Sequence, residues 1–88
     1  MEKFIIFEGM IDQQASQRLV GAINNASIQE PIPSKITILF SSLGGNIYEG
    51  FLIASIIQNS KIPIAIHATN HVDSIANVIY LSSKDRSA

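Results

Sequence analysis

The fold is decided by residues Lys35–Gly50, which read KITILFSSLGGNIYEG. The first part, Lys35–Ser41, is apolar or β-branched at nearly every position, which predicts a strand with both faces buried, as in a parallel sheet. Ser42–Gly45 ends that strand, because paired glycines suit a tight turn. A helix is expected from Ile47 to about Asn59, with so little polar surface that most of it should be covered. The side chains expected inside are Ile47, Phe51, Leu52, Ala54, Ile56 and Ile57.

The residues before this stretch predict one more strand and one more helix. Lys3–Phe7 is a short run rich in Ile and Phe that predicts a buried strand. Asp12 can cap a helix that runs to about Asn25. The apolar face of that helix is expected to hold Ala15, Leu19, Ala22, Ile23 and Ala26. Pro31 and Pro33 then indicate a loop.

The residues after it continue the alternation. Pro63 precedes a third predicted strand, Ile64–Ala68, and Thr69–Val72 is expected to be a turn. Asp73 should open a third helix that runs to about Leu81, and Ser82–Arg86 should form a polar end. Because strands and helices alternate, the sequence predicts an α/β fold in which residues 1–88 form a single domain with parallel strands.

The composition points to a partner and argues against several classes of function. The chain is 47% hydrophobic and only 15% charged, whereas an ordinary soluble domain is about 25% charged. We therefore expect apolar surface that another subunit, or more of the same chain, would cover. The formal charge of −1 and the scattered basic residues give no basic patch for nucleic acid. No run of residues is long enough for a membrane span or resembles a signal peptide, so the expected compartment is the cytoplasm.

Two loops with unusual chemistry should meet at the carboxyl edge of the sheet, where α/β folds place their functional groups. In the first, the amides of Gly44 and Gly45 could hold an anion or a developing oxyanion, or could simply form a tight turn. In the second, Ser74 could be a nucleophile or a serine that hydrogen-bonds its own helix. No phosphate-loop, dinucleotide or G-x-S-x-G pattern is present.

The chain has two histidines, His67 and His71. His67 falls inside the third predicted strand, where a structural role is expected. His71 lies three residues before Ser74 and could fold back toward the serine as a base. Together with Asp73 these histidines could form a metal site, but their spacing matches no zinc pattern, so no metal and no cofactor are expected. The absence of cysteine rules out disulfides and thiolate chemistry.

Several of these segments together resemble the proteolytic subunit of the Clp protease family. Lys35–Gly50 resembles the strand, S-x-G-G turn and helix start of that family, with SSLGGN in place of the family's N-S-P-G-G-S. Phe4–Ile23 resembles the family's opening strand and first helix. Asp73–Asn77, DSIAN, stands where the family has A-S-M-G-A around its nucleophilic serine. The resemblance covers essentially the whole chain, although crotonase-type enzymes share a similar fold and turn.

The resemblance implies a role for each residue of the two loops. Ser74 would be the nucleophile, the backbone amides of Gly44 and Ile75 would be the oxyanion donors, and Gly45 would shape a groove for an extended peptide substrate. The implied fold is a ClpP/crotonase-like series of βα units around a mainly parallel sheet, truncated after the third helix. A homo-oligomer and an ATPase chaperone partner are also implied.

The departures from the family limit the expected activity. The positions of the family's catalytic His and Asp fall beyond Ala88, and Asp73 places a carboxylate where the family has a small residue. We therefore expect a Clp-like serine peptidase subunit or fragment that is inactive or weakly active alone. The first alternative is a non-catalytic assembly or interaction module with the same fold. The second is a crotonase-like binder of acyl thioesters.

Overall fold

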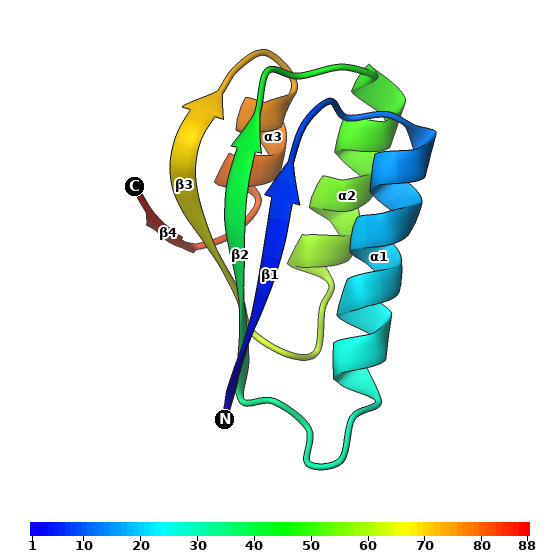
Figure 1. Ribbon diagram of the computed structural model, residues 1–88, viewed down its shortest axis with the longest axis vertical. Helices are drawn as coiled ribbons and strands as arrows, with labels where there is room; N and C mark the ends of the chain where they lie inside the picture. The colour runs from blue at the N-terminus through cyan, green and yellow to red at the C-terminus, as the bar shows by residue number, and fades with distance from the viewer.

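The computed structural model covers residues 1–88 and contains a parallel four-stranded sheet with three helices against one of its faces (Figure 1). The strands lie in sequence order, so each βα unit adds one strand to the same edge. This arrangement confirms the predicted α/β fold with parallel strands. The strands are β1 (Glu2–Glu8), β2 (Lys35–Ser42), β3 (Ile64–Val72) and β4 (Asp85–Ser87), and the helices are α1 (Gln13–Ser27), α2 (Ile47–Gln58) and α3 (Ala76–Leu81).

The hydrophobic core lies between the sheet and the helices. Alternate residues of β2, which are Ile36, Ile38 and Phe40, are fully buried beneath them. Phe40 also stacks on Phe7 of β1, with the ring centroids 5.5 Å apart. The expected face of α1 is buried at Ala15, Leu19, Ile23 and Ala26, and the predicted cap is confirmed by a hydrogen bond of 2.7 Å from the Ala15 amide to Asp12 Oδ1.

The other face of the sheet carries no helix, and here the predicted burial of β1 and β2 is wrong. β1 is an edge strand, and its Phe4 and Ile6 are 59% and 75% exposed. The neighbouring Thr37 and Leu39 on β2 are only partly buried. An apolar run in the sequence predicts a strand, but it does not tell whether a second layer covers that strand. We call this surface the open face; it contains Phe4, Ile6, Thr37, Leu39, Ala65 and His67.

The prediction of a mostly buried α2 is also wrong. Ile47, Phe51 and Leu52 are 58%, 53% and 48% exposed, and Tyr48 is 84% exposed. The helix buries only one side, at Gly50, Ile53, Ala54 and Ile57. Its outer side is therefore an apolar surface with no partner in this chain. None of the three helices is long and apolar enough to cross a membrane.

The third strand is longer than predicted, because β3 continues through the residues expected to form a turn. Its register against β2 shifts between Phe40 and Ser42, where three residues of β3 lie opposite one of β2. The Ser41 hydroxyl supports this bulge by accepting a 3.1 Å hydrogen bond from the His71 amide. A bulge re-aims the end of a strand, and here it directs the chain toward Ser74.

The end of the chain differs from the prediction in two ways. Asp73 does not open α3, which begins at Ala76 without a side-chain cap. The fold also continues past the third helix, because Asp85–Ser87 adds β4 to the sheet. Asp85 forms a 2.8 Å ion pair with Lys35, reaching across β3, and the hydrogen bond and charge of Asp85 raise the pKa of Lys35 above its usual range. These contacts explain why a polar segment forms an edge strand.

Candidate functional site

Ser74 lies in the sharp turn that joins β3 to α3. It is the only residue other than glycine with a positive φ, at 56°, a conformation that L-residues rarely adopt. The turn is fixed by a 3.0 Å hydrogen bond from the Asp73 amide to the Ser42 carbonyl and by a 3.1 Å bond from the Ala76 amide to the Asp73 carbonyl. The Ser74 side chain is exposed, and its hydroxyl has no partner in the chain. Strained serines of this kind occur where a turn presents a nucleophile.

Gly44 lies directly against Ser74. A Cβ added to Gly44 would lie 2.8 Å from Ser74 Cβ, 3.3 Å from Ser74 Oγ and 3.1 Å from the Asp73 carbonyl oxygen. Gly44 also has a φ of 107°, so both the local backbone and the space around it require glycine. The two loops singled out in the sequence are therefore in contact at the carboxyl edge of the sheet.

Gly45 is held by Ile11, a residue that the sequence analysis did not single out. The Asn46 amide donates a 2.7 Å hydrogen bond to the Ile11 carbonyl, and the Ile11 amide donates a 2.9 Å bond to the Gly44 carbonyl. These bonds close a short parallel bridge between Ile11 and Gly45. The Gly45 backbone N–H and C=O themselves have no partner, so they are free to pair with an extended peptide, which is the arrangement that a substrate groove needs.

The two predicted oxyanion donors differ in their hydrogen bonding. The Ile75 amide donates to no group in the chain and adjoins Ser74. The Gly44 amide donates a 3.1 Å hydrogen bond to the buried Ser42 hydroxyl, so an oxyanion would have to compete with that hydroxyl. The Ile75 side chain is buried against Gly50, where any Cβ would clash with it. Gly50, a glycine in the middle of the predicted second helix, was the only feature of the sequence that indicated the contact of Ile75 with this helix.

Neither histidine is hydrogen-bonded to Ser74. His67 lies on the open face, and its Nδ1 is 2.7 Å from Ser87 Oγ. His71 Nδ1 is 3.6 Å from Asp73 Oδ2, and both side chains are 56% exposed. The structure thus places His71 beside the serine turn, paired with a carboxylate, while His67 belongs to a different surface.

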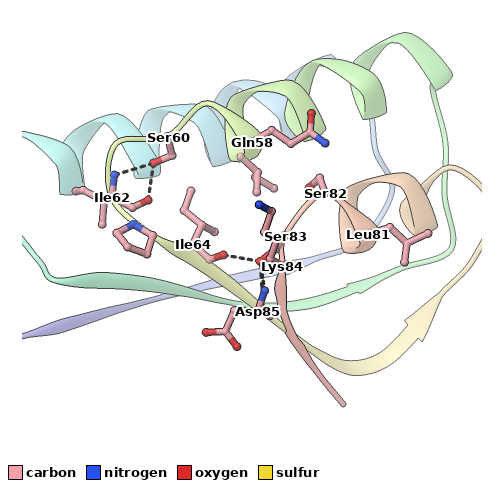
Figure 2. Close-up of a pocket in the computed structure, with 11 residues that line it drawn as sticks. Gln58, Ser60, Ile62, Ile64, Leu81, Ser82, Ser83, Lys84 and Asp85 are labelled. Atoms are coloured by element: carbon pink, nitrogen blue, oxygen red, sulfur yellow. Dashed lines mark hydrogen bonds between the residues drawn. The ribbon is translucent and has the colours of Figure 1, made fainter.

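A pocket of about 570 Å³ lies away from this site, near the amino ends of β3 and β4 (Figure 2). Its wall is built around hydrogen bonds of Ser60 with Ile62 and of Ser83 with Ile64 and Asp85. These serines satisfy backbone groups, which is a structural role. A smaller pocket of about 230 Å³ lies at the carboxyl edge beside the serine turn. It is lined by Glu8, Gly9, Met10, Ser41, Ser42, Leu43, Asn70 and His71.

The strain at Ser74 gives a prediction that separates a functional serine from a structural one. Ser74→Gly should stabilise the chain by about 1 kcal/mol, because glycine adopts positive φ without the steric cost paid by an L-residue. Ser74→Ala should leave the stability within about 0.5 kcal/mol, since the hydroxyl has no partner to lose. Thermal unfolding of the three proteins measures both effects. A large loss of stability in Ser74→Ala would instead indicate a structural hydroxyl.

Comparison with protein families gives a match over nearly the whole chain. The family model described as Clp protease matches residues 1–87. No curated protein matches the chain.

Solved structures with the same fold include several proteases. ClpP1 from Listeria monocytogenes superimposes with a TM-score of 0.76 and 26% identity over 91% of this chain. The ClpP protease catalytic domain from Plasmodium falciparum gives a TM-score of 0.81 and 28% identity over 93% of this chain. A mutant of the 1510-N membrane-bound stomatin-specific protease gives 0.86 over 98% of this chain, and at 21% identity it shows the fold alone. The chain spans 46%, 45% and 42% of these three chains, which is less than half of each.

Proposed function

The chain belongs to the Clp protease family, and we propose that it is the nucleophile-bearing part of a Clp-like serine peptidase, inactive or weakly active by itself. Ser74 is the proposed nucleophile. The amides of Ile75 and Gly44 are the proposed oxyanion donors, and the free backbone groups of Gly45 pair with an extended peptide substrate.

The single observation that carries this proposal is the strained turn at Ser74. Positive φ at a serine costs stability, and such strain is retained where it serves a site. The turn leaves the hydroxyl exposed and unbonded, beside a glycine whose lack of a Cβ makes room for it. A serine whose purpose was to hydrogen-bond its own helix would need neither feature.

The proposed site lacks a general base that is hydrogen-bonded to Ser74 within residues 1–88. His71 is the only histidine near the turn, and it is paired with Asp73 rather than with Ser74. We therefore propose that efficient activation of Ser74 uses a base from another segment or another subunit, with His71 as a weak local substitute. Without a positioned base a serine peptidase retains only a small part of its rate.

Labelling with a fluorophosphonate probe tests the proposal. We expect slow labelling of the chain that Ser74→Ala abolishes and His71→Ala reduces, since a probe of this kind reports an activated serine. Ser55→Ala is a matched control, because Ser55 is an exposed serine on α2, away from the turn. Labelling that survives Ser74→Ala would contradict a nucleophilic role for Ser74, whereas absence of labelling would mean that residues 1–88 supply no working base.

A second candidate function is that of a non-catalytic assembly module, favoured by the exposed outer side of α2. Ile47, Tyr48, Phe51 and Leu52 are between 48% and 84% exposed on one helix, and exposed apolar side chains that gather in this way mark interaction surfaces. That surface is suited to contact with further subunits of a homo-oligomer, or with the ATPase partner that the family likeness suggests. Failure of the labelling experiment combined with a discrete oligomer would favour this second function.

A further inference from the structure

We infer that Ser42 is a positioning residue of the proposed site, whose hydroxyl keeps the Gly44 amide occupied until an oxyanion forms on Ser74 and the Leu43–Gly44 peptide turns toward it. The inference rests on the proposed function, in which that amide is an oxyanion donor. The Gly44 amide donates a 3.1 Å hydrogen bond to Ser42 Oγ, and the Ser42 side chain is only 2% exposed. Ser74 is exposed. In the free chain the N–H of Gly44 is therefore directed toward a buried hydroxyl.

The burial of Gly44 explains why this hydrogen bond is present in the free chain. A buried N–H without an acceptor costs stability, and no group other than the Ser42 hydroxyl accepts from Gly44. The Ser42 hydroxyl is thus the resting partner of an amide whose second partner, the oxyanion, exists only during a reaction. An ionised acceptor forms a stronger hydrogen bond than a neutral hydroxyl, so an oxyanion displaces Ser42 once it has formed.

The Leu43–Gly44 peptide is able to turn, because the bond to Ser42 is the only hydrogen bond that it makes. The Leu43 carbonyl has no donor, and the Leu43 side chain is 58% exposed. The peptides on either side are held in place. The Ser42 carbonyl accepts a 3.0 Å bond from the Asp73 amide, and the Gly44 carbonyl accepts a 2.9 Å bond from the Ile11 amide. A rotation between these fixed peptides changes the φ of Gly44, and glycine adopts φ of either sign without a steric cost.

The two oxyanion donors of the proposed site therefore differ in their availability. The Ile75 amide is free from the start, whereas the Gly44 amide becomes available only after its bond to Ser42 is broken. A hydrogen bond between neutral groups corresponds to a factor of roughly 2 to 12 in a rate or an equilibrium constant. Ser42 thus moderates the reactivity of Ser74 by about that factor, and it does so without contacting the reacting atoms.

Removal of the Ser42 hydroxyl tests the inference through the rate of fluorophosphonate labelling. Ser42→Ala should be labelled roughly 2- to 12-fold faster than the unaltered chain, because the Gly44 amide no longer has to leave an acceptor. Ser42→Cys keeps a side chain of similar size with a weakly accepting sulfur, so it should also be labelled faster and replaces Ser42→Ala should that variant not fold. Ser41→Ala is the matched control. Ser41 is the neighbouring buried serine, but its hydroxyl accepts from the His71 amide, so this variant should not raise the rate.

A second measurement needs neither a nucleophile nor a base, so it separates a failure of this inference from a failure of the proposed function. Ser74→Asp places a permanent carboxylate on the serine turn, and aspartate adopts positive φ more readily than most residues. The pKa of this carboxyl, measured by NMR, should be about 0.4–1 unit lower in Ser74→Asp/Ser42→Ala than in Ser74→Asp, since the freed Gly44 amide stabilises the ionised form. Ser74→Asp/Ser41→Ala should show no such decrease.

Two results would overturn the inference. One is an unchanged pKa in Ser74→Asp/Ser42→Ala, and the other is Ser74-dependent labelling that Ser42→Ala leaves equal or slower. Either would mean that the Gly44 amide does not have to leave Ser42 in order to reach position 74. Absence of labelling from every variant, together with the lowered pKa, would support the resting bond and would mean that residues 1–88 do not activate Ser74.

Discussion

Replacing Gly45 by alanine should destabilise the chain by about 2–6 kcal/mol, the largest effect expected of any single methyl group in it. The new Cβ would lie 2.9 Å from the Ile11 nitrogen and closer still to the Ile11 carbonyl oxygen, and both are backbone atoms that cannot rotate away. The residue also has a φ of 148°, and backbone strain of this kind costs about 1–3 kcal/mol, with overpacking adding a similar amount. Thermal unfolding should show a loss of roughly 10–30 °C, or no cooperative transition at all.

Two other glycines separate the causes of that loss. Gly9 has a φ of 120° but nothing within 4 Å of an added Cβ, so Gly9→Ala measures strain without a clash. Gly21 lies in α1 with open space around it, so Gly21→Ala should stabilise the helix by about 0.5–1 kcal/mol. Should Gly45→Ala unfold at the same temperature as Gly9→Ala, the bridge from Ile11 to Gly45 would not constrain this loop.

The order of the elements could be predicted from the sequence because it depends on local patterns. The β-branched run at Lys35–Ser41, the Asp12 cap and the glycine pair each fix the conformation of neighbouring residues. A parallel sheet follows from their alternation, since each helix must return the chain to the same end of the sheet. The meeting of Gly44 with Ser74 follows in turn, because both loops leave the carboxyl ends of adjacent strands.

The predicted burial of α2 and of the strands β1 and β2 was wrong because burial depends on whether another layer of structure covers a surface. The apolar outer side of α2 and the open face of the sheet have the composition of buried surface, and the sequence cannot tell a missing partner from a present one. The prediction of the end of β3 was wrong for a different reason. A bulge supported by the Ser41 hydroxyl lets residues typical of a turn remain in the strand, and only the pairing with β2 reveals it.

The details of the candidate site were the least accessible to sequence reasoning. The positive φ of Ser74 is imposed by the hydrogen bonds from the Asp73 amide to the Ser42 carbonyl and from the Ala76 amide to the Asp73 carbonyl. Serine has no intrinsic preference for positive φ, so the sequence does not predict this conformation. The donation of the Gly44 amide to Ser42 Oγ likewise depends on a side-chain rotation that only the folded loop defines. The φ of Ser74 and the hydrogen bond of the Gly44 amide both depend on the contact between the two loops. Neither can therefore be predicted from the sequence of one loop alone.

Gly44→Ala should reduce the rate of fluorophosphonate labelling of Ser74 by about 100-fold, because Gly44 is in contact with Ser74. The added Cβ would lie 2.8 Å from Ser74 Cβ, so the serine turn has to move away from the Ile75 amide and the developing oxyanion. A displacement of about 1 Å of a reacting group is enough for a loss of that size. The measurement is the labelling rate at saturating probe, compared with the rate for Gly9→Ala, which strains a loop without touching Ser74.

A double-mutant cycle then shows whether the clash between Gly44 and Ser74 is the cause. Ser74→Gly removes the Cβ that the new methyl group of Gly44→Ala would strike, so the stability lost in Gly44→Ala should be partly recovered in the combined variant. We expect a coupling free energy of about 1–3 kcal/mol from thermal unfolding, the range seen for residues in direct contact. Strict additivity would mean that Gly44→Ala acts only through its own backbone φ of 107°, and the two loops would then be neighbours without being one site.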